Sequence, residues 1–127
     1  MRILVYISVC FSFFSCSNNN GVEITIIPNE TINFGEIIQG EIVPIEFKIK
    51  NTGTENLKIT NAKASCGCTK LKYPKEVIKP GDEEIISVTF DSKNKIGEQK
   101  KKITLTTNAT PKIKTLTIEC IILPSKN

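Results

Sequence analysis

The sequence predicts an all-β protein, an immunoglobulin-like antiparallel β-sandwich of about seven strands. Branched aliphatic residues and Thr are abundant whereas Ala is scarce, a composition that favours strands over helices. Short segments of alternating apolar and polar residues recur about every 8–12 residues, and no segment keeps the 3.6-residue period of an amphipathic helix. A chain of 127 residues has room for one such core.

Each strand is predicted from its alternation. In Glu41–Asn51 every second residue from Val43 to Ile49 is apolar, whereas charged residues such as Glu46 and Lys48 lie between them. The same pattern predicts seven strands, at Val22–Ile27, Thr31–Ile38, Glu41–Asn51, Leu57–Ser65, Glu84–Phe90, Lys100–Thr107 and Lys114–Ile122.

Turn residues separate these segments. Pro28-Asn29, Gln39-Gly40, Asn51-Thr52-Gly53 and Lys79-Pro80-Gly81-Asp82 each combine residues that favour turns. Three consecutive lysines, Lys100–Lys102, are typical of an edge strand that is protected from pairing with other chains.

The composition excludes several kinds of chemistry. The chain has no His, so it lacks the commonest general base and cannot form a Ser-His-Asp or Cys-His triad. No Gly-rich phosphate loop is present. Arg2, within the apolar N-terminal segment, is the single Arg, so every other cation of the chain is Lys, whereas base edges and phosphates are usually recognised by Arg. We expect no enzyme activity, no catalytic residue, no cofactor and no nucleic-acid partner.

The N-terminus has the plan of a secretory signal. Arg2 precedes an apolar run from Ile3 to Phe14, which is followed by Ser15, Cys16 and an abruptly polar stretch. The run is too short to span a bilayer as a helix. A buried N-terminal strand carrying Cys10 and Cys16 is the alternative interpretation.

The end of this run resembles the lipobox of bacterial lipoproteins, in which the signal is removed just before a diacylated cysteine. The resemblance implies a signal peptide at residues 1–15, lipidation of Cys16, a polar tether over 16–22 and a folded domain at 23–127. Phe13 stands where the pattern prefers Leu, and looser lipoboxes of this kind occur in Bacteroidetes-type bacteria. Several acyl chains together give stable anchoring in a membrane.

A second resemblance covers about residues 30–122. Phe34-Gly35, the segment around Asn51-Thr52-Gly53, Ser65-Cys66-Gly67-Cys68-Thr69 and Ile78-Lys79-Pro80-Gly81 occur in the order that resembles the family called domain of unknown function 1573. The resemblance implies an Ig-like fold, similar to the modules of major sperm protein and of cilia-associated ASH/Hydin proteins, on an exported and often lipidated envelope protein. It implies no catalytic activity.

Cys66 and Cys68 are the candidate thiol pair. Two residues apart on a strand they would face the same side with Cα atoms ~6.6 Å apart, near the upper limit for a disulfide. Gly67 can bend the chain and shorten that distance. A structural disulfide or packing role, a redox-active pair, a metal site and a disulfide to a partner remain open. Zinc would lack ligands, because no His is available, so no metal site is expected. Cys120 alternates with apolar residues of its strand and should face the core.

Together these features predict a lipid-anchored cell-envelope protein, attached to the membrane through Cys16. We expect it on the outer rather than the inner membrane, facing the periplasm or the outside. Its Ig-like domain is interpreted as a non-enzymatic binding or scaffolding module with an envelope protein as partner. The alternative is a thiol-redox or metal-handling protein that acts through Cys66 and Cys68.

Overall fold

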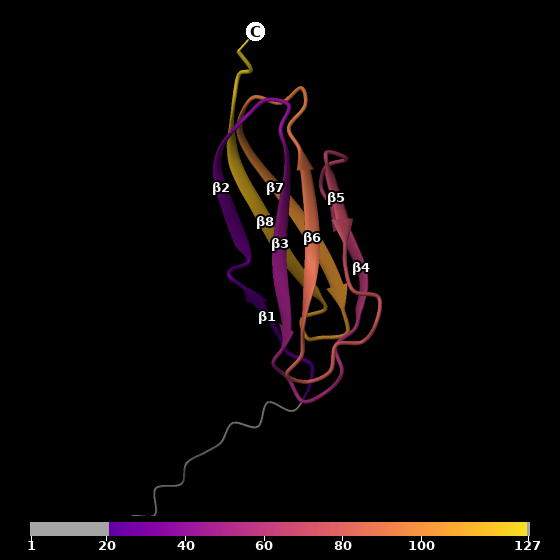
Figure 1. The fold of residues 1–127 in the computed structure, drawn as a ribbon. Helices are drawn as coiled ribbons and strands as arrows, with labels where there is room; N and C mark the ends of the chain where they lie inside the picture. Colours follow the sequence, from indigo (N-terminus) through magenta and orange to yellow (C-terminus); the bar gives the residue numbers. More distant parts are fainter. Residues whose placement is uncertain (1–20, 127) are drawn as a thin grey trace, which may run out of the picture.

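The computed structural model describes residues 21–126. The predicted signal peptide and Cys16 lie outside the described residues. Residues 21–126 contain no helix, and their strands form two four-stranded sheets, so the prediction of an all-β sandwich is confirmed (Figure 1). The eight strands are β1 (Ile24–Ile27), β2 (Thr31–Ile38), β3 (Ile42–Asn51), β4 (Ile59–Ala64), β5 (Thr69–Lys72), β6 (Glu83–Asp91), β7 (Gly97–Thr107) and β8 (Ile113–Leu123).

One sheet has the strand order β1-β3-β6-β5 and the other β2-β8-β7-β4. This is the arrangement of an immunoglobulin constant-type sandwich in which the first strand is divided between the two sheets. The division occurs at Pro28, whose missing N–H cannot continue the ladder of β1 with β3. β2 then pairs with β8 in parallel, whereas every other strand pair is antiparallel.

The core lies between the sheets and is built by period-two alternation. In β3, Ile45, Phe47 and Ile49 are buried while Glu46 and Lys48 are exposed. The fully buried side chains of largest volume are Phe47, Phe90, Ile49, Leu57, Ile78, Ile86, Ile103, Leu105, Leu116, Ile118, Ile122 and Val88. Cys120 belongs to this core, as the alternation of its strand predicted.

Phe34 and Gly35 have distinct structural roles in β2. The Phe34 ring packs across the sandwich on Phe90, with centroids 5.9 Å apart. Gly35 has a φ of +77° and lies in a bulge of β2, between Asn33 and Glu36. This bulge interrupts the ladder between β2 and β8.

The seven predicted strands are present with small differences at their ends, and two expectations need correction. β5 was not predicted, because four residues with a single inward apolar side chain, Leu71, give almost no periodic signal. The strand containing Lys100–Lys102 is not an edge strand, because β7 lies between β8 and β4. The register with β4 ends at Ile103 and a last hydrogen bond joins Ser65 to Lys102. Lys100 and Lys101 therefore lie in a part of β7 that pairs with β8 alone, at a local edge of the sheet.

The sandwich has two distinct ends. At one end Gly21 donates to the Thr54 hydroxyl and accepts from the Thr54 amide, beside the β3–β4 turn. At the opposite end the Asp91 amide donates to the carbonyl of Cys68. Strands of eleven residues, β7 and β8, span the distance between the ends, which is about 35 Å. No helix within residues 21–126 is long and apolar enough to cross a membrane.

Candidate functional site

The candidate site is the Cys66-Gly67-Cys68 bend, where the chain crosses from β4 in one sheet to β5 in the other. A disulfide joins Cys66 and Cys68, whose Cα atoms are 5.2 Å apart. This distance is within the ordinary range for disulfides, because the chain bends here and is not extended. The bend does not use the left-handed backbone region at Gly67, and a Cβ at this position would meet nothing within 4 Å.

Local hydrogen bonds hold the bend. The Cys68 amide donates to Cys66 Sγ at 3.1 Å, and the Thr69 amide donates to the Cys66 carbonyl at 3.2 Å. The Thr69 hydroxyl lies 3.7 Å from Cys68 Sγ. Cys68 is partly buried against the core, whereas Gly67 is exposed. The disulfide therefore lies at the surface with one cysteine packed inward.

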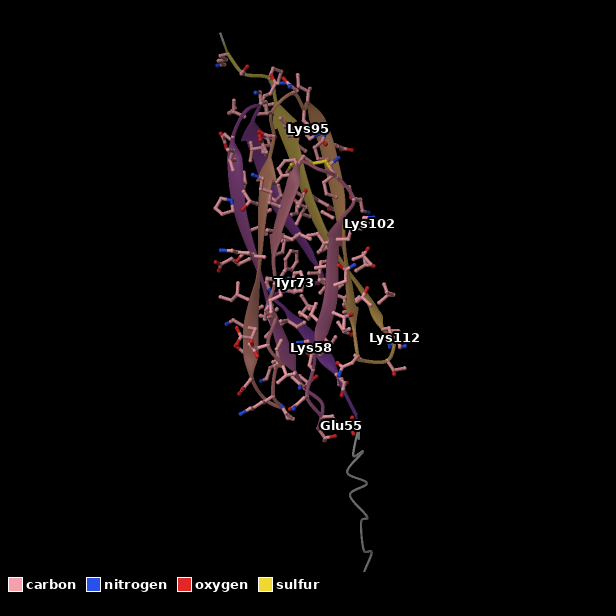
Figure 2. All side chains as sticks on the ribbon, turned by 90° about the vertical axis from the view of Figure 1, so that its right-hand side faces the viewer. Glu55, Lys58, Tyr73, Lys95, Lys102 and Lys112 are labelled. Atoms are coloured by element: carbon pink, nitrogen blue, oxygen red, sulfur yellow. A yellow bond between two sulfur atoms is a disulfide. The ribbon has the colours of Figure 1, made fainter. Side chains whose placement is uncertain are left out.

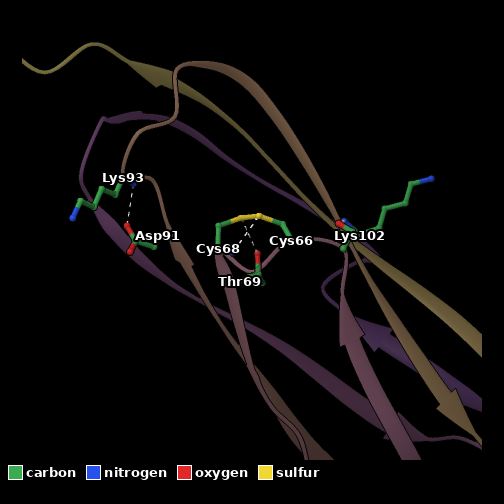
Figure 3. The surroundings of a disulfide bond; sticks show 7 residues. Cys66, Cys68, Thr69, Asp91, Lys93 and Lys102 are labelled. Carbon is green, nitrogen blue, oxygen red and sulfur yellow. Dashed lines mark hydrogen bonds between the residues drawn. A yellow bond between two sulfur atoms is a disulfide. The ribbon is translucent and has the colours of Figure 1, made fainter.

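Strands on either side connect the bend to both sheets. The Ser65 amide donates to the Lys102 carbonyl at 2.9 Å, and the Cys68 carbonyl accepts from the Asp91 amide at 2.9 Å. Figure 3 shows Lys102 on one side of the disulfide and Asp91 with Lys93 on the other. A shallow depression of about 120 Å³ beside Cys68 is lined by Ile42, Gly67, Cys68, Lys70, Thr89 and Asp91.

The other cysteines do not join this site. Cys120 is a free thiol that is buried in the core. Burial raises its pKa above the ordinary value, and the charge of Lys101 opposes this shift in part. A buried thiol with a raised pKa is a poor nucleophile. Cys16 lies outside the described residues.

The bend is chemically suited to thiol–disulfide exchange more than to metal binding. Within residues 21–126 no three residues among the Cys, Asp and Glu side chains are grouped to hold a metal ion. A disulfide cannot coordinate a metal unless it is first reduced, because thiolates are the ligands. A partly exposed disulfide can accept a thiolate from a partner.

Sequence reasoning missed a second cluster, at the opposite end of the sandwich. Asn51 is fully buried, and its Nδ2 donates to the carbonyls of Glu55 at 2.7 Å and Ile78 at 2.8 Å. Its Oδ1 accepts from the Gly53 amide, and its carbonyl accepts from the Gly81 amide. The Asn-Thr-Gly and Ile-Lys-Pro-Gly pieces of the sequence pattern thus meet around one side chain. The turn chemistry of both was visible in the sequence, but their contact was not.

The fold defines a class, the immunoglobulin-like β-sandwich proteins, and solved structures agree. A protein of unknown function from Porphyromonas gingivalis W83 has a TM-score of 0.70 at 13% identity, over 87% of this chain and 51% of that one. The chain therefore spans about half the length of that protein. The ASH/PapD-like domain 7 of human CEP192 has a TM-score of 0.64 at 12% identity, over 98% of this chain and 100% of that domain.

An MSP family member from C. elegans, WR4, has a TM-score of 0.52 at 11% identity, over 79% of this chain and 97% of that one. At such identities these structures show the fold alone. No curated protein matches this sequence. The family model for proteins of unknown function DUF1573 matches residues 25–122. This chain belongs to the DUF1573 family, as its sequence pattern indicated.

Proposed function

We propose that this chain is a lipid-anchored protein of the cell envelope whose Ig-like domain binds a partner protein and carries out no catalysis. The observation that supports it most is the placement of Gly21 at one end of the sandwich and the Cys66–Cys68 bend at the other. An anchor at Cys16 would leave the far end and both lateral sides of the domain free to meet a partner. We propose the outer membrane as its location.

The anchor is tested by replacing Cys16. Cells expressing the Cys16→Ser variant should incorporate no labelled palmitate into the protein, and the protein should leave the membrane fraction. Cys10→Ser is the matched control, because Cys10 lies within the proposed signal and should not affect labelling. A Cys16→Ser protein that still carries palmitate would contradict the proposal, and density separation of the two membranes tests the location.

The binding role is tested separately. Photo-reactive residues placed at exposed positions around the native, membrane-bound protein should crosslink to one envelope protein from one face and not from the others. If no position yields a discrete crosslinked product, the binding role is wrong, whatever the result for the anchor.

The Cys66–Cys68 disulfide supports a second candidate function, thiol–disulfide exchange. One thiolate of a partner dithiol would attack a sulfur, forming a mixed disulfide and releasing the other cysteine as a thiolate. The second partner thiolate would then displace the remaining cysteine, which leaves the partner as a disulfide and Cys66 and Cys68 reduced. The test is incubation of the oxidised protein with a dithiol at defined potentials, followed by mass spectrometry. If the bond stays intact at the potentials of the exported compartment, this second function is excluded.

A further inference from the structure

The two lateral sides of the sandwich carry opposite charge. Within or next in sequence to β2 and the first half of β3, the charged side chains are Glu30, Glu36, Glu41 and Glu46. Lysines reach this side only at Lys48 and Lys50, which lie opposite β1, and at Lys114, which pairs with Glu30. Within β4 and β5 the charged side chains are Lys63, Lys70 and Lys72, without any acidic residue. Just outside these strands Lys58 and Lys75 are accompanied by Glu55 and Glu76. Figure 1 shows β2 on one side of the sandwich and β4 and β5 on the other.

The edges on the acidic side are blunted against pairing. β1 has four residues and ends before Pro28, so most of β3 extends beyond it. The Asn51 amide donates to the Asp82 carbonyl on the β6 side of β3. Because the direction of backbone hydrogen bonding alternates from residue to residue, the backbone of Pro44 faces the opposite, open side, where it offers no N–H. The bulge at Gly35 interrupts the edge of β2. Proline and bulges are known protections of exposed edges.

The basic side has two edges, and one of them is short. β5 has four residues, and its first amide, that of Thr69, already bonds to the Cys66 carbonyl. β4 has six residues, contains no proline and is bulged only at its start, between Ile59 and Asn61. Its last four residues therefore form a regular edge that neither proline nor a bulge protects. Lys63 is its one protecting charge, and it disfavours basic strands while leaving acidic ones acceptable.

The backbone of Ala62 and Ala64 points out of that edge. The Ser65 amide donates to the Lys102 carbonyl, so Ser65 is a hydrogen-bonded position opposite β7. Residues alternate along an antiparallel ladder, and Ala64 opposite Ile103 and Ala62 opposite Leu105 are the intervening positions. Their N–H and C=O groups face away from β7 and have no hydrogen-bond partner within residues 21–126.

The side chains around this edge match two kinds of contact. On the inward side, Ala62, Cys68, Leu71 and Tyr73 are only partly buried against the core. On the outward side, Lys63 and Lys102 are exposed, and neither forms an ion pair with the described acidic residues. Figure 2 views this side directly and shows Tyr73 near its centre, with Lys58 below and Lys102 above.

We propose that the β4 edge docks an extended segment of the partner protein, in which acidic and apolar residues alternate. This deepens the binding role proposed above and rests on it. The segment adds a strand to the sheet by hydrogen bonds to Ala62 and Ala64. Its apolar side chains face inward over Leu71 and Tyr73, and its carboxylates face outward beside Lys63.

Affinity and selectivity come from different parts of this arrangement. Main-chain hydrogen bonds and covered apolar surface supply the binding free energy, since each exposed ion pair changes the affinity by about fivefold at most. The lysines steer acidic segments to this edge and disfavour basic ones. Salt should therefore weaken binding modestly and should reduce the preference for acidic segments.

Amide hydrogen exchange of the full chain tests the proposal with a synthetic probe, the acetylated and amidated heptapeptide Glu-Val-Glu-Val-Glu-Val-Glu. The amides of Ala62 and Ala64 should exchange on the order of tenfold more slowly in its presence. The equivalent Lys-Val peptide should have no effect. No change at these two amides, or equal effects of both peptides, would overturn the inference.

Two variants sharpen the test. Ala62→Pro removes an outward-facing N–H that does not bond to β7. The variant protein should therefore fold but no longer bind the probe peptide. If it does not fold, Lys63→Glu provides the alternative, with an expected loss of probe affinity of about fivefold. Lys79→Glu, in an exposed turn outside this edge, is the matched control and should bind the probe normally.

Crosslinking in native membranes separates this inference from the function it rests on. A photo-reactive residue at Lys63 should capture the partner, and one at Glu46 on the acidic side should not. Capture from Glu46 alone would overturn the docking edge and leave the binding role intact. Capture from neither position, nor from any other face, would overturn both.

Discussion

The side-chain amide of Asn51 donates to the backbone carbonyl of Ile78 at 2.8 Å, joining turns that are 27 residues apart in the chain. The same side chain accepts from the Gly53 amide at 3.0 Å. Burying an amide is costly unless its hydrogen-bonding groups are satisfied, and here both its nitrogen and its oxygen are. The bond thus fixes how the β3–β4 turn lies on the segment that leads into β6.

Replacing Asn51 should destabilise the fold strongly. Asn51→Ala removes the hydrogen bonds of this buried side chain to the Glu55 and Ile78 carbonyls and to the Gly53 amide, although the Ile78 carbonyl still accepts from the Leu57 amide. The loss should lower the free energy of unfolding by about 2–4 kcal/mol. Asn51→Asp should be at least as damaging, because a carboxylate accepts hydrogen bonds only and would face two carbonyl oxygens. Urea denaturation measures both. Asn56→Ala, at an exposed position of the next turn, is the control and should change stability by less than about 0.5 kcal/mol.

Gly53 should not tolerate a side chain, although its backbone is not in the left-handed region. A Cβ there would lie 2.2 Å from the Gly21 carbonyl oxygen and 2.6 Å from the Glu23 amide nitrogen. Gly53→Ala should therefore displace the chain before β1 and cost about 2 kcal/mol or more. Faster hydrogen exchange in β1 and a lower urea midpoint would show it.

Gly67→Ala is the matched substitution, since a Cβ at Gly67 meets nothing within 4 Å. It should leave the urea midpoint almost unchanged. Equal effects of the two substitutions would contradict the close contact between Gly53 and Gly21.

The sequence was sufficient to predict the sandwich because its long strands alternate clearly. β2 was predicted with the observed bounds, and β3 differs by one residue at its start. The division of the first strand between sheets was not predictable, because β1 and β2 have the same local pattern and only their partners differ. β5 was missed because Leu71 alone marks its inward side.

The candidate sites were predictable to different degrees. The spacing of Cys66 and Cys68 identified the pair but left several roles open, since a local bend decides whether two such cysteines can bond. The docking edge depends on which backbone groups of β4 face away from β7. The register between the two strands decides this, and the sequence of β4 alone does not reveal the register. The difference in charge between these segments can be read from the sequence. That it separates two sides of the domain becomes clear only from the structure, in which β2 and β4 lie on opposite sides.

Removing the disulfide should loosen β5 more than the rest of the domain. The bond closes a very short loop, for which chain entropy predicts a stabilisation of about 1.5 kcal/mol. The Cys66→Ser/Cys68→Ser protein should lose this amount in urea denaturation and exchange faster at Thr69–Lys72. A reducing agent should have the same effect on the wild-type chain and none on the double variant. Unchanged exchange in β5 would contradict a structural role for the bond.

The thiol of Cys120 should make stability depend on pH in the alkaline range. Burial raises its pKa above the ordinary value of 9.0, with Lys101 opposing the shift in part. Below about pH 8 the thiol is neutral in both states, so it contributes no pH dependence. As the pH rises past that value, the unfolded chain ionises first and binds fewer protons than the folded chain. The free energy of unfolding must then fall, until the folded thiol ionises as well.

Comparison with Cys120→Val isolates this effect from the titration of lysines and tyrosines. The variant keeps an apolar side chain of similar size at a buried position and removes the titrating group. The difference in unfolding free energy between wild type and variant should be constant from pH 6 to about 8. Above about pH 9 the wild type should lose unfolding free energy relative to the variant. The Cys120 thiol should also react with a thiol reagent only as fast as the domain opens. A difference that stays flat to pH 10.5, about where lysines titrate, would show that the folded protein accommodates the thiolate.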